Sequence, residues 1–576
     1  MTKYYNTSMN IFPNKKKILL CLLFLIVFSF SIRIYKIDTA PSGVSPDEAS
    51  WGYNAYSILQ TGKDEHGVSY PIIFQAFGDQ KLPLYIYSLV PSIKAFGLNN
   101  FSIRLPAAVV GTLVTLAIFF FLMKFGFSTE TSFIGAFITA TSPWQIILSR
   151  IFGYDSNFGL LFFILGLLFS FMVYKKGRLL YAILSGICFG LTLYSYVAFR
   201  LISPVILLSF IFIYMRNVKL FDLRRAMLLV SFLVVICPLI FLSFAGKGNV
   251  RLNQASSTTN SGVALNINEN RYFCNQTLPK LLCYINSNKV VAYSRNYLSR
   301  YMYVFSPDYI FISGEKDDNF LNVENFGLLS IILLPFYLLG LLYLWNRIIT
   351  KSLTKNELFL IVGLMVAPLP AILVDMPQKV RISALFPFYI ILILYGVSQA
   401  KDFVKKFINE KGYYVGLILL LIIFNIFFMI NFLAVHVNKY DVVYGDYIPK
   451  LMQYLNQQDK KTQIYIASID EGIEYYAYVN KVDPSIFQKT VIREKPNAIG
   501  FAQATDLENI HVTKSDIYQI YCKSKMNKTH SLYVTKVDYQ QKLGNAKKII
   551  SLRNGTFRMA FVYDMNEINN KDIKCK

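Results

Sequence analysis

The stretch ILLCLLFLIVFSFSIRI at residues 18–34 is followed closely by GVSPDEASWGYNAY at residues 43–56. The first stretch is predominantly apolar and long enough to cross a bilayer core as a helix. The second places two adjacent carboxylates, Asp47 and Glu48, just after the chain leaves that span. Two interpretations follow: these residues cap a helix N-terminus, or the acids carry out chemistry at the membrane surface.

The same apolar pattern recurs along the whole chain. Of its 576 residues, 54% are hydrophobic and 16% are charged, against a usual charged share of about 25%. We therefore predict a polytopic α-helical membrane protein with about eleven spans. The expected spans cover residues 18–34, 105–123, 130–148, 157–174, 179–197, 201–215, 226–245, 326–345, 358–374, 382–398 and 415–433.

The charge distribution predicts the orientation of these spans. The net charge is +24, and much of the excess lies in short loops between apolar segments, as the positive-inside rule requires. No basic patch with interleaved aromatics indicates a nucleic-acid partner. Lys15, Lys16 and Lys17 precede a first span that we interpret as a retained signal anchor. We expect a multi-pass protein of the plasma membrane with a cytoplasmic N-terminus and an outer C-terminus.

Two domains follow from this topology. Residues 1–433 form the expected transmembrane domain, with long outer loops at residues 35–104 and 246–324. Two stretches of the first loop, at residues 51–59 and 82–97, are expected to be helices at the membrane surface. Residues 434–576 are expected to form a small extracytoplasmic α/β domain. Its predicted strands are TQIYIAS (462–468), HSLYVTK (530–536) and FRMAFVYD (557–564), and DEGIEYYAYVN (470–480) is its predicted helix.

Cysteine and acid spacings leave two further alternatives. Cys274 and Cys283 lie in one outer loop, where they form a disulfide or remain two unpaired thiols. Asp64, Glu65 and His66 offer divalent-metal ligand atoms, but three adjacent polar residues more commonly form a turn. We predict no metal site and no cofactor.

Charged residues near the predicted outer ends of the spans are the candidates for chemistry. A carboxylate can take a proton from an acceptor, and fixed cations can stabilise charge on a departing phosphate. Simpler explanations exist: Arg104 and Arg381 can reach lipid headgroups, and Asp155 can cap a helix. The candidates are the acids Asp47, Glu48 and Asp155 and the cations Lys81, Arg104, Arg150, Lys379 and Arg381.

The order of these pieces resembles the GT-C glycosyltransferases of the protein O-mannosyltransferase and lipid A aminoarabinose-transferase type. The resemblance covers nearly the whole chain, although each motif is short. It rests on SPDEASWGYNAYSILQTGKDEHG (45–67), FGDQKLPLYIY (77–87), SIRLPAAVVGTL (102–113), TSPWQIILSRIFGYDSNF (141–158), FSPDYIFISG (305–314), PQKVRISALFPFYIILILYG (377–396) and IYIASIDEGIEYYAYVNKVDPSIFQ (464–488).

The resemblance implies a GT-C fold and inverting transfer of a sugar from a polyprenyl-phosphate carrier outside the membrane. It implies that Asp47 is the catalytic base, that Arg104 holds the donor phosphate and that Asp155 positions donor or acceptor. Lys81 would lie near the lipid phosphate, although a Leu separates it here from the following Pro. Arg150, Lys379 and Arg381 would be cations of the cavity.

The acceptor, whether lipid, glycan or protein, is left open, because the long His-rich insert of eukaryotic mannosyltransferases is absent. Besides the sugar donor, membrane lipids are the expected partners. Two alternative functions remain: a transporter or flippase of lipid-linked sugars, and an O-antigen-type ligase or polymerase. The first needs charges along a crossing path, and the spans contain few ionisable residues. The second does not require the early Asp-Glu pair.

Overall fold

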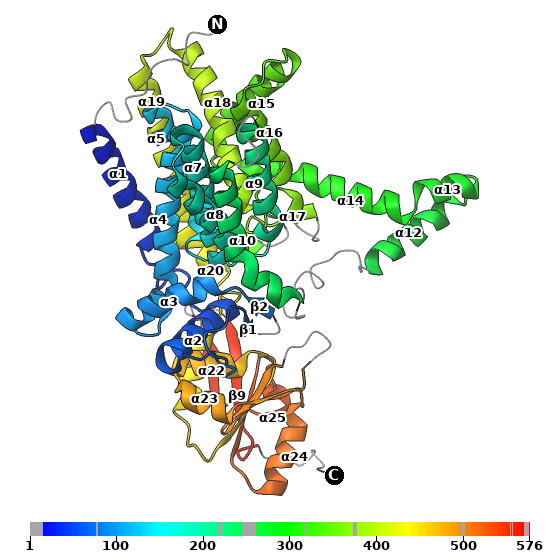
Figure 1. Ribbon diagram of the computed structural model, residues 1–576. Helices are drawn as coiled ribbons and strands as arrows, with labels where there is room; N and C mark the ends of the chain where they lie inside the picture. The colour runs from blue at the N-terminus through cyan, green and yellow to red at the C-terminus, as the bar shows by residue number, and fades with distance from the viewer. Residues whose placement is uncertain are drawn as a thin grey trace. The chain divides into compact units, whose positions relative to one another are not determined.

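The computed structural model divides the chain into two compact units (Figure 1). Unit 1 comprises Met1–Tyr35 and Ala107–Met429, and unit 2 comprises Lys36–Pro106 and Ile430–Lys576. The structure describes residues 15–76, 79–151, 153–216, 222–244, 261–316, 319–372, 377–496, 502–552, 555, 557–568 and 575.

Unit 1 is built from helices throughout its described residues, because apolar segments in lipid must satisfy their backbone hydrogen bonds internally. Its longer helices are α1 (Lys15–Ile34), α4 (Asn100–Phe125), α5 (Thr129–Thr141), α7 (Tyr154–Lys176), α8 (Leu179–Thr192), α9 (Phe199–Met215), α10 (Leu223–Phe244), α12 (Ser261–Cys274), α14 (Lys289–Tyr303), α15 (Leu334–Ile349), α16 (Lys355–Val366), α18 (Phe386–Val404) and α19 (Glu410–Ile430). Its shorter helices and turns are α6 (Pro143–Leu148), α13 (Lys280–Asn286), η2 (Asp308–Ile312), η3 (Asn319–Leu321), η4 (Ile331–Leu333), α17 (Leu369–Ile372) and η5 (Ser383–Leu385).

Six helical segments among the described residues are long and apolar enough to cross a membrane, and three shorter helices are also apolar. The six are Asn100–Phe125, Tyr154–Lys176, Leu223–Leu242, Ile331–Ile349, Ser383–Val404 and Glu410–Lys439, and the three are Ile18–Ile34, Leu179–Thr192 and Phe199–Met215. The prediction of a polytopic helical membrane protein is confirmed. The expected number of spans, about eleven, stays a prediction.

Two of the predicted spans are each divided between two helices. The span expected at 130–148 breaks at Ser142, where the Ser142 hydroxyl accepts a hydrogen bond from the backbone N–H of Gln145 and caps α6. Pro143 explains the break, since proline disfavours helical backbone at the residue before it and suits the first helical position. The span expected at 358–374 divides into α16 and α17, on either side of Pro368.

The first segment of unit 2 contains two helices and a hairpin that precede α4. These elements are α2 (Pro46–Thr61), β1 (Phe74–Ala76), β2 (Asp79–Lys81) and α3 (Pro83–Phe96). The strands pair antiparallel, with Phe74 opposite Lys81. The rings of Trp51 on α2 and Tyr85 on α3 meet edge to face at 4.9 Å. Both helices expected in this loop are therefore present.

The second segment of unit 2 is a mixed α/β fold around a seven-stranded sheet with the order β4-β5-β6-β3-β7-β9-β8. Strands β6, β3 and β7 are parallel, and the outer pairs are antiparallel. The strands are β3 (Gln463–Ile466), β4 (Ile492–Arg493), β5 (Ala504–Leu507), β6 (Ile510–Val512), β7 (Ser531–Thr535), β8 (Lys548–Ser551) and β9 (Arg558–Asp564). The helices are η6 (Asn431–His436), α20 (Val437–Lys439), α21 (Tyr447–Asn456), α22 (Gly472–Asn480), α23 (Pro484–Thr490), α24 (Ile517–Asn527) and α25 (Gln540–Leu543). The three predicted strands and the predicted helix are confirmed as β3, β7, β9 and α22.

The two segments of unit 2 pack closely against each other. A Cβ on Gly52 of α2 would lie 2.7 Å from the Tyr478 ring of α22, so only glycine permits this approach. The Tyr53 hydroxyl donates to the carbonyl of Val482 at 3.2 Å, and its ring meets that of Phe487 at 5.0 Å. The predicted division placed the first outer loop in the transmembrane domain, whereas the structure groups it with the C-terminal segment. Long-range packing of this kind leaves no local sequence pattern.

Two disulfides form in the structure, Cys274–Cys283 and Cys522–Cys575. The first confirms one of the two sequence-based alternatives and excludes a pair of free thiols. The second joins residues 53 apart and was not predicted. It ties α24 to the end of the chain.

A buried acid lies where the two segments of unit 2 meet. Glu65 and Glu474 are 2% and 3% exposed, and one side-chain oxygen of each accepts no hydrogen bond. Burial, and then the nearby carboxylate of Glu65, raise the pKa of Glu474 to about 8. The carboxyl of Glu474 is therefore protonated at neutral pH in the folded protein.

We expect Glu474→Gln to make the protein less sensitive to alkaline pH. Between pH 4.5 and about 8 the unfolded chain binds fewer protons than the native chain, so the free energy of unfolding falls as pH rises. The slope approaches about 1.4 kcal/mol per pH unit. Thermal unfolding at pH 5.5 and pH 8 should show a smaller Tm difference for this variant than for the wild type. Glu508→Gln, at an exposed position, should keep the wild-type difference, and an unchanged difference in Glu474→Gln would contradict the assignment.

Candidate active site

The two adjacent acids stand in the first turn of α2. Ser45 is the N-cap residue: its hydroxyl accepts from the N–H of Glu48 at 3.3 Å, and the Ser45 N–H donates to Glu48 Oε2 at 3.0 Å. This reciprocal pair is a capping box, with Pro46 at the first helical position. The expectation of a helix cap is therefore confirmed for Glu48.

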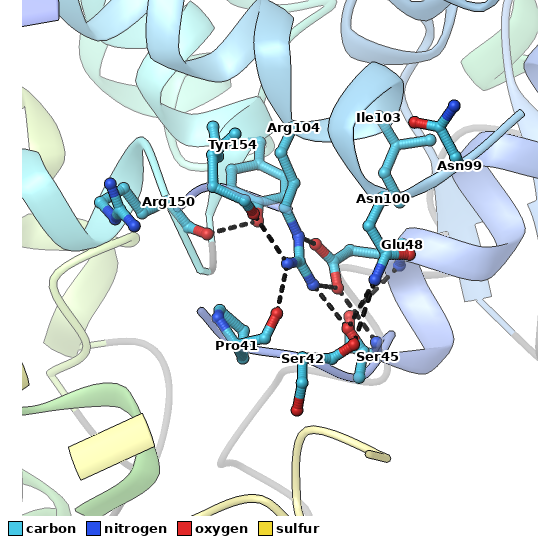
Figure 2. A network of polar contacts seen from close by, with 12 residues as sticks. Pro41, Ser42, Ser45, Glu48, Asn99, Asn100, Ile103, Arg104, Arg150 and Tyr154 are labelled. Carbon is cyan, nitrogen blue, oxygen red and sulfur yellow. Dashed lines mark hydrogen bonds and ion pairs between the residues drawn. The ribbon is translucent and has the colours of Figure 1, made fainter. Parts of the chain in front are cut away.

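Arg104, near the start of α4, is completely enclosed by the loop before α2 (Figure 2). Its Nε and one terminal nitrogen donate to the two oxygens of Glu48, at 2.6 and 3.1 Å. The remaining N–H groups donate to the carbonyls of Ile37, Pro41 and Gly43 at 2.6–3.0 Å. A guanidinium has five N–H donors, and these five hydrogen bonds use all of them.

This arrangement gives Arg104 a structural role. Its charge is fully buried and is stabilised by a buried carboxylate and three carbonyls. The loop before α2 is thereby fixed to the start of α4. The expected role of Arg104 in holding a donor phosphate stays a prediction. To bind a phosphate, Arg104 would have to replace one of these hydrogen bonds with a bond to the phosphate.

Asp47 has different surroundings from its neighbour. Its Oδ1 lies 2.6 Å from Nζ of Lys81, and its side chain is 32% exposed, whereas that of Glu48 is 3% exposed. Lys81 ends β2 and is 6% exposed, and its Nζ also lies 5.8 Å from the centre of the Trp51 ring. The structure thus brings two predicted site residues together, with the acid accessible and the cation behind it.

The C-terminal segment contributes groups that sequence analysis missed. Glu471 lies just before α22, and the charge of Asp47 is among the influences that raise its pKa, after burial and Asp470. Tyr475 of α22 is buried. Burial raises the pKa of its hydroxyl well above the usual value, and the nearby carboxylates of Glu471 and Asp47 raise it further. Glu471 follows the carboxyl end of the parallel strand β3, which is a common place for functional residues. Its position after a predicted strand could therefore have marked it as a candidate from the sequence.

Arg150 in unit 1 caps the end of α1. Its side chain is fully buried and donates to the carbonyls of Ile32 and Arg33 and to that of Tyr35, at 2.8–2.9 Å. The last carbonyls of a helix lack partners within the helix, and a cation there also interacts favourably with the helix dipole. These contacts make Arg150 a helix cap, and its expected role as a cavity cation stays a prediction.

Lys379 is also fully buried. Its Nζ lies 3.5 Å from Glu315 Oε2 and donates to the carbonyl of Leu321. Glu315 in turn accepts from the backbone N–H of Lys379. Lys379 therefore holds the second outer loop in place, and its expected role as a cavity cation stays a prediction.

Asp155 and Arg381 lie in segments that pack together. Asp155 is in the first turn of α7 and half-buried, where its Oδ1 accepts from the Ser156 N–H, but the N-cap residue of this helix is Gly153 and not Asp155 as expected. The hydroxyl of the next residue, Ser156, donates to the carbonyl of Val380 and contacts the Ser383 hydroxyl, on either side of Arg381. The predicted substrate roles of Asp155 and Arg381 stay predictions.

The possible metal site at residues 64–66 is a turn. Asp64 Oδ1 accepts from the N–H groups of His66 and Val68, at 2.9 and 2.8 Å. Among the residues that the structure describes, no group of three or more His, Cys, Asp and Glu side chains is placed to hold a metal ion.

Comparison with known proteins shows which proteins the chain is similar to. Residues 81–243 match a family described as dolichyl-phosphate-mannose-protein mannosyltransferase. The structure of ArnT from Cupriavidus metallidurans bound to undecaprenyl phosphate is similar over 95% of this chain and 98% of that chain, with 11% identity and a TM-score of 0.50. Its apo form is similar over 96% and 99%, with 10% identity and a TM-score of 0.50.

A third structure is the archaeal oligosaccharyltransferase AglB from Archaeoglobus fulgidus in complex with an inhibitory peptide and a dolichol-phosphate. It covers 81% of this chain with 15% identity and a TM-score of 0.46. This chain spans 64% of the length of that oligosaccharyltransferase. No curated protein matches the sequence.

Through the family match over residues 81–243 and the likeness to the ArnT fold, the chain is similar to multi-pass membrane glycosyltransferases of the GT-C type. The predicted GT-C fold and the resemblance stated from the sequence are confirmed. The family match favours glycosyl transfer over the alternative of a transporter.

We expect Arg104→Met to destabilise the protein strongly. The substitution leaves the Glu48 carboxylate and three carbonyls buried without their donor, and breaking a buried ion pair from one side costs about 3–5 kcal/mol. The purified protein in detergent should unfold at a clearly lower temperature. Asp47→Asn, which changes a partly exposed acid of the same helix turn, should shift Tm much less; similar shifts in both variants would contradict the structural role of Arg104.

Proposed function

We propose that the protein transfers a sugar from a polyprenyl-phosphate carrier to an acceptor on the outer side of the membrane, with inversion at the sugar carbon. The observation that carries the proposal is the Asp47–Lys81 pair, in which an accessible carboxylate is held by a buried cation. The described family acts on a dolichyl-phosphate sugar, and the similar ArnT structure holds undecaprenyl phosphate, which supports a lipid-phosphate donor.

Asp47 would act as the general base. Its carboxylate takes the proton from the acceptor nucleophile while that atom attacks the anomeric carbon and the bond to phosphate breaks. A single displacement of this kind inverts the configuration at that carbon. Glu48 cannot share this role, since both of its oxygens already accept hydrogen bonds from Arg104 and one also accepts from the cap.

Lys81 would have two functions in this scheme. Its ammonium group fixes the orientation of Asp47 at 2.6 Å, and it adds positive charge where the phosphate leaves. Lys is suited to this because it is a compact point charge with three donors. We propose that this cation makes a resident metal ion unnecessary. We also propose that donor and acceptor meet on the extracytoplasmic side.

We expect Asp47→Asn to lose at least about 100-fold in turnover, because general-base catalysis contributes about 10²–10⁴-fold. Sugar release from a polyprenyl-phosphate donor by the reconstituted protein measures this. Donor binding should persist, which separates loss of chemistry from loss of the site. Asp38→Asn, an exposed acid of the same loop, is the matched control and should keep full activity. Near-normal turnover in Asp47→Asn would refute the general-base role.

Chelation should leave the activity within about twofold, because Lys81 rather than a divalent ion stands beside Asp47. The measurement is turnover by the reconstituted protein after dialysis against EDTA, with and without added Mg²⁺ or Mn²⁺. A loss of turnover that either ion restores would show that the site uses a metal.

A further inference from the structure

The second outer loop contains three helices that expose many large apolar side chains. We call α12, α13 and α14 together, residues 261–303, the helical arm (Figure 1). None of the described residues of α14 is buried. The end of the arm presents Phe273, Leu278, Leu281, Leu282, Tyr284 and Ile285, each 51–70% exposed. Apolar groups gathered in this way indicate an interaction surface.

Several contacts hold the helices of the arm together. The Cys274–Cys283 disulfide joins the end of α12 to α13, and Cys283 is fully buried. The guanidinium of Arg271 lies 4.4 Å from the centre of the Tyr284 ring, and its Nε donates to the carbonyl of Ser287 at 2.5 Å. These contacts turn the large apolar side chains of α13 outward.

The charge of the arm is predominantly positive. It contains five basic residues and one acid, Glu269. The five are Arg271, Lys280, Lys289, Arg295 and Arg300. They are distributed over all three helices, as suits an extended anionic surface better than a single bound anion. Lys280, Lys289 and Arg295 are exposed.

The arm is connected to membrane-spanning structure on both sides. It follows α10, which contains the candidate span Leu223–Leu242, and its last helix contacts α17. The Tyr301 hydroxyl donates to the carbonyl of Met365 near the end of α16, at 3.1 Å. In Figure 1, α14 runs across the direction of the bundle helices of unit 1, not along it. This direction suits a helix that lies along a membrane surface better than one that crosses the membrane.

A groove between the three helices has a volume of about 770 Å³. Its lining combines the apolar side chains Ile267, Ile285 and Val291 with the cations Arg271 and Lys289. Apolar side chains beside cations match the boundary between acyl chains and phosphate headgroups.

We propose that the helical arm docks on an anionic lipid bilayer. The apolar side chains of α13 enter the boundary between headgroups and acyl chains, and the exposed cations contact lipid phosphates. Chemistry and geometry agree on this occupant: the surface is apolar at its end, basic along its length and fixed at one end to the spanning helices. The proposal stands independently of the glycosyl-transfer reaction.

The test places a tryptophan on the arm of the full-length protein. Leu282→Trp changes a half-exposed position, and a Trp345→Phe background removes a tryptophan that is itself 63% exposed on α15. The protein is reconstituted into phosphatidylcholine vesicles with or without 30 mol% phosphatidylglycerol, with part of the phosphatidylcholine brominated. The fluorescence of the same background without the added tryptophan is subtracted. We expect bromine quenching of the introduced tryptophan to be at least twofold stronger with phosphatidylglycerol than without.

Two controls make the result specific. Met526→Trp, on α24 at a position 71% exposed, should show little quenching in either lipid. The triple change Lys280→Gln, Lys289→Gln and Arg295→Gln affects exposed side chains only and should remove the dependence on phosphatidylglycerol. Absence of quenching, or equal quenching in both lipids, would overturn the proposal. The proposal would also be overturned if the introduced tryptophan were protected from quenching by soluble acrylamide to an extent that depends on the protein-to-lipid ratio. Such a dependence would show that a second copy of the protein covers the arm.

Discussion

The buried pair of Arg104 and Glu48 is the interaction on which the candidate site depends. A guanidinium removed from water is tolerated only if its charge is paired and its N–H groups are satisfied. Here one carboxylate and three carbonyls meet that requirement. The carbonyls come from the loop before α2 and the carboxylate from its first turn. A single side chain thus fixes both the path of the loop and the orientation of the helix that carries Asp47.

This constraint explains why neighbouring acids differ. Consecutive helical residues point about 100° apart, so Asp47 and Glu48 cannot face the same partner. Glu48, at the third helical position, serves the cap and Arg104. Asp47, at the second, faces Lys81 and remains accessible. From the sequence, the two acids could either cap a helix or carry out chemistry. The structure shows that Glu48 belongs to the cap, and the catalytic role of Asp47 stays a proposal.

The buried cations follow the same physical rule. Arg104, Arg150 and Lys379 are each fully buried, and each donates to backbone carbonyls. Burial of such a group demands hydrogen-bond partners, and helix ends and loops supply unpaired carbonyls. A cation near the end of a membrane span is therefore as well suited to holding the backbone as to binding a phosphate. Sequence alone cannot separate these roles, because residue type and position are the same in both.

Local patterns in the sequence are enough to predict several features of the protein. Apolar runs gave the spanning helices, β-branched residues gave β3, β7 and β9, and the order of short motifs gave the fold class. The Ser45–Glu48 spacing contains the capping box, and a short loop between two cysteines allowed the first disulfide. Three further features became visible in the folded chain alone. Arg104 pairs with a residue 56 positions earlier, Lys81 lies behind Asp47, and the first outer loop packs with the C-terminal segment. These contacts depend on the shapes of surfaces far apart in the chain, and side-chain packing of that kind has no periodicity for a sequence to show.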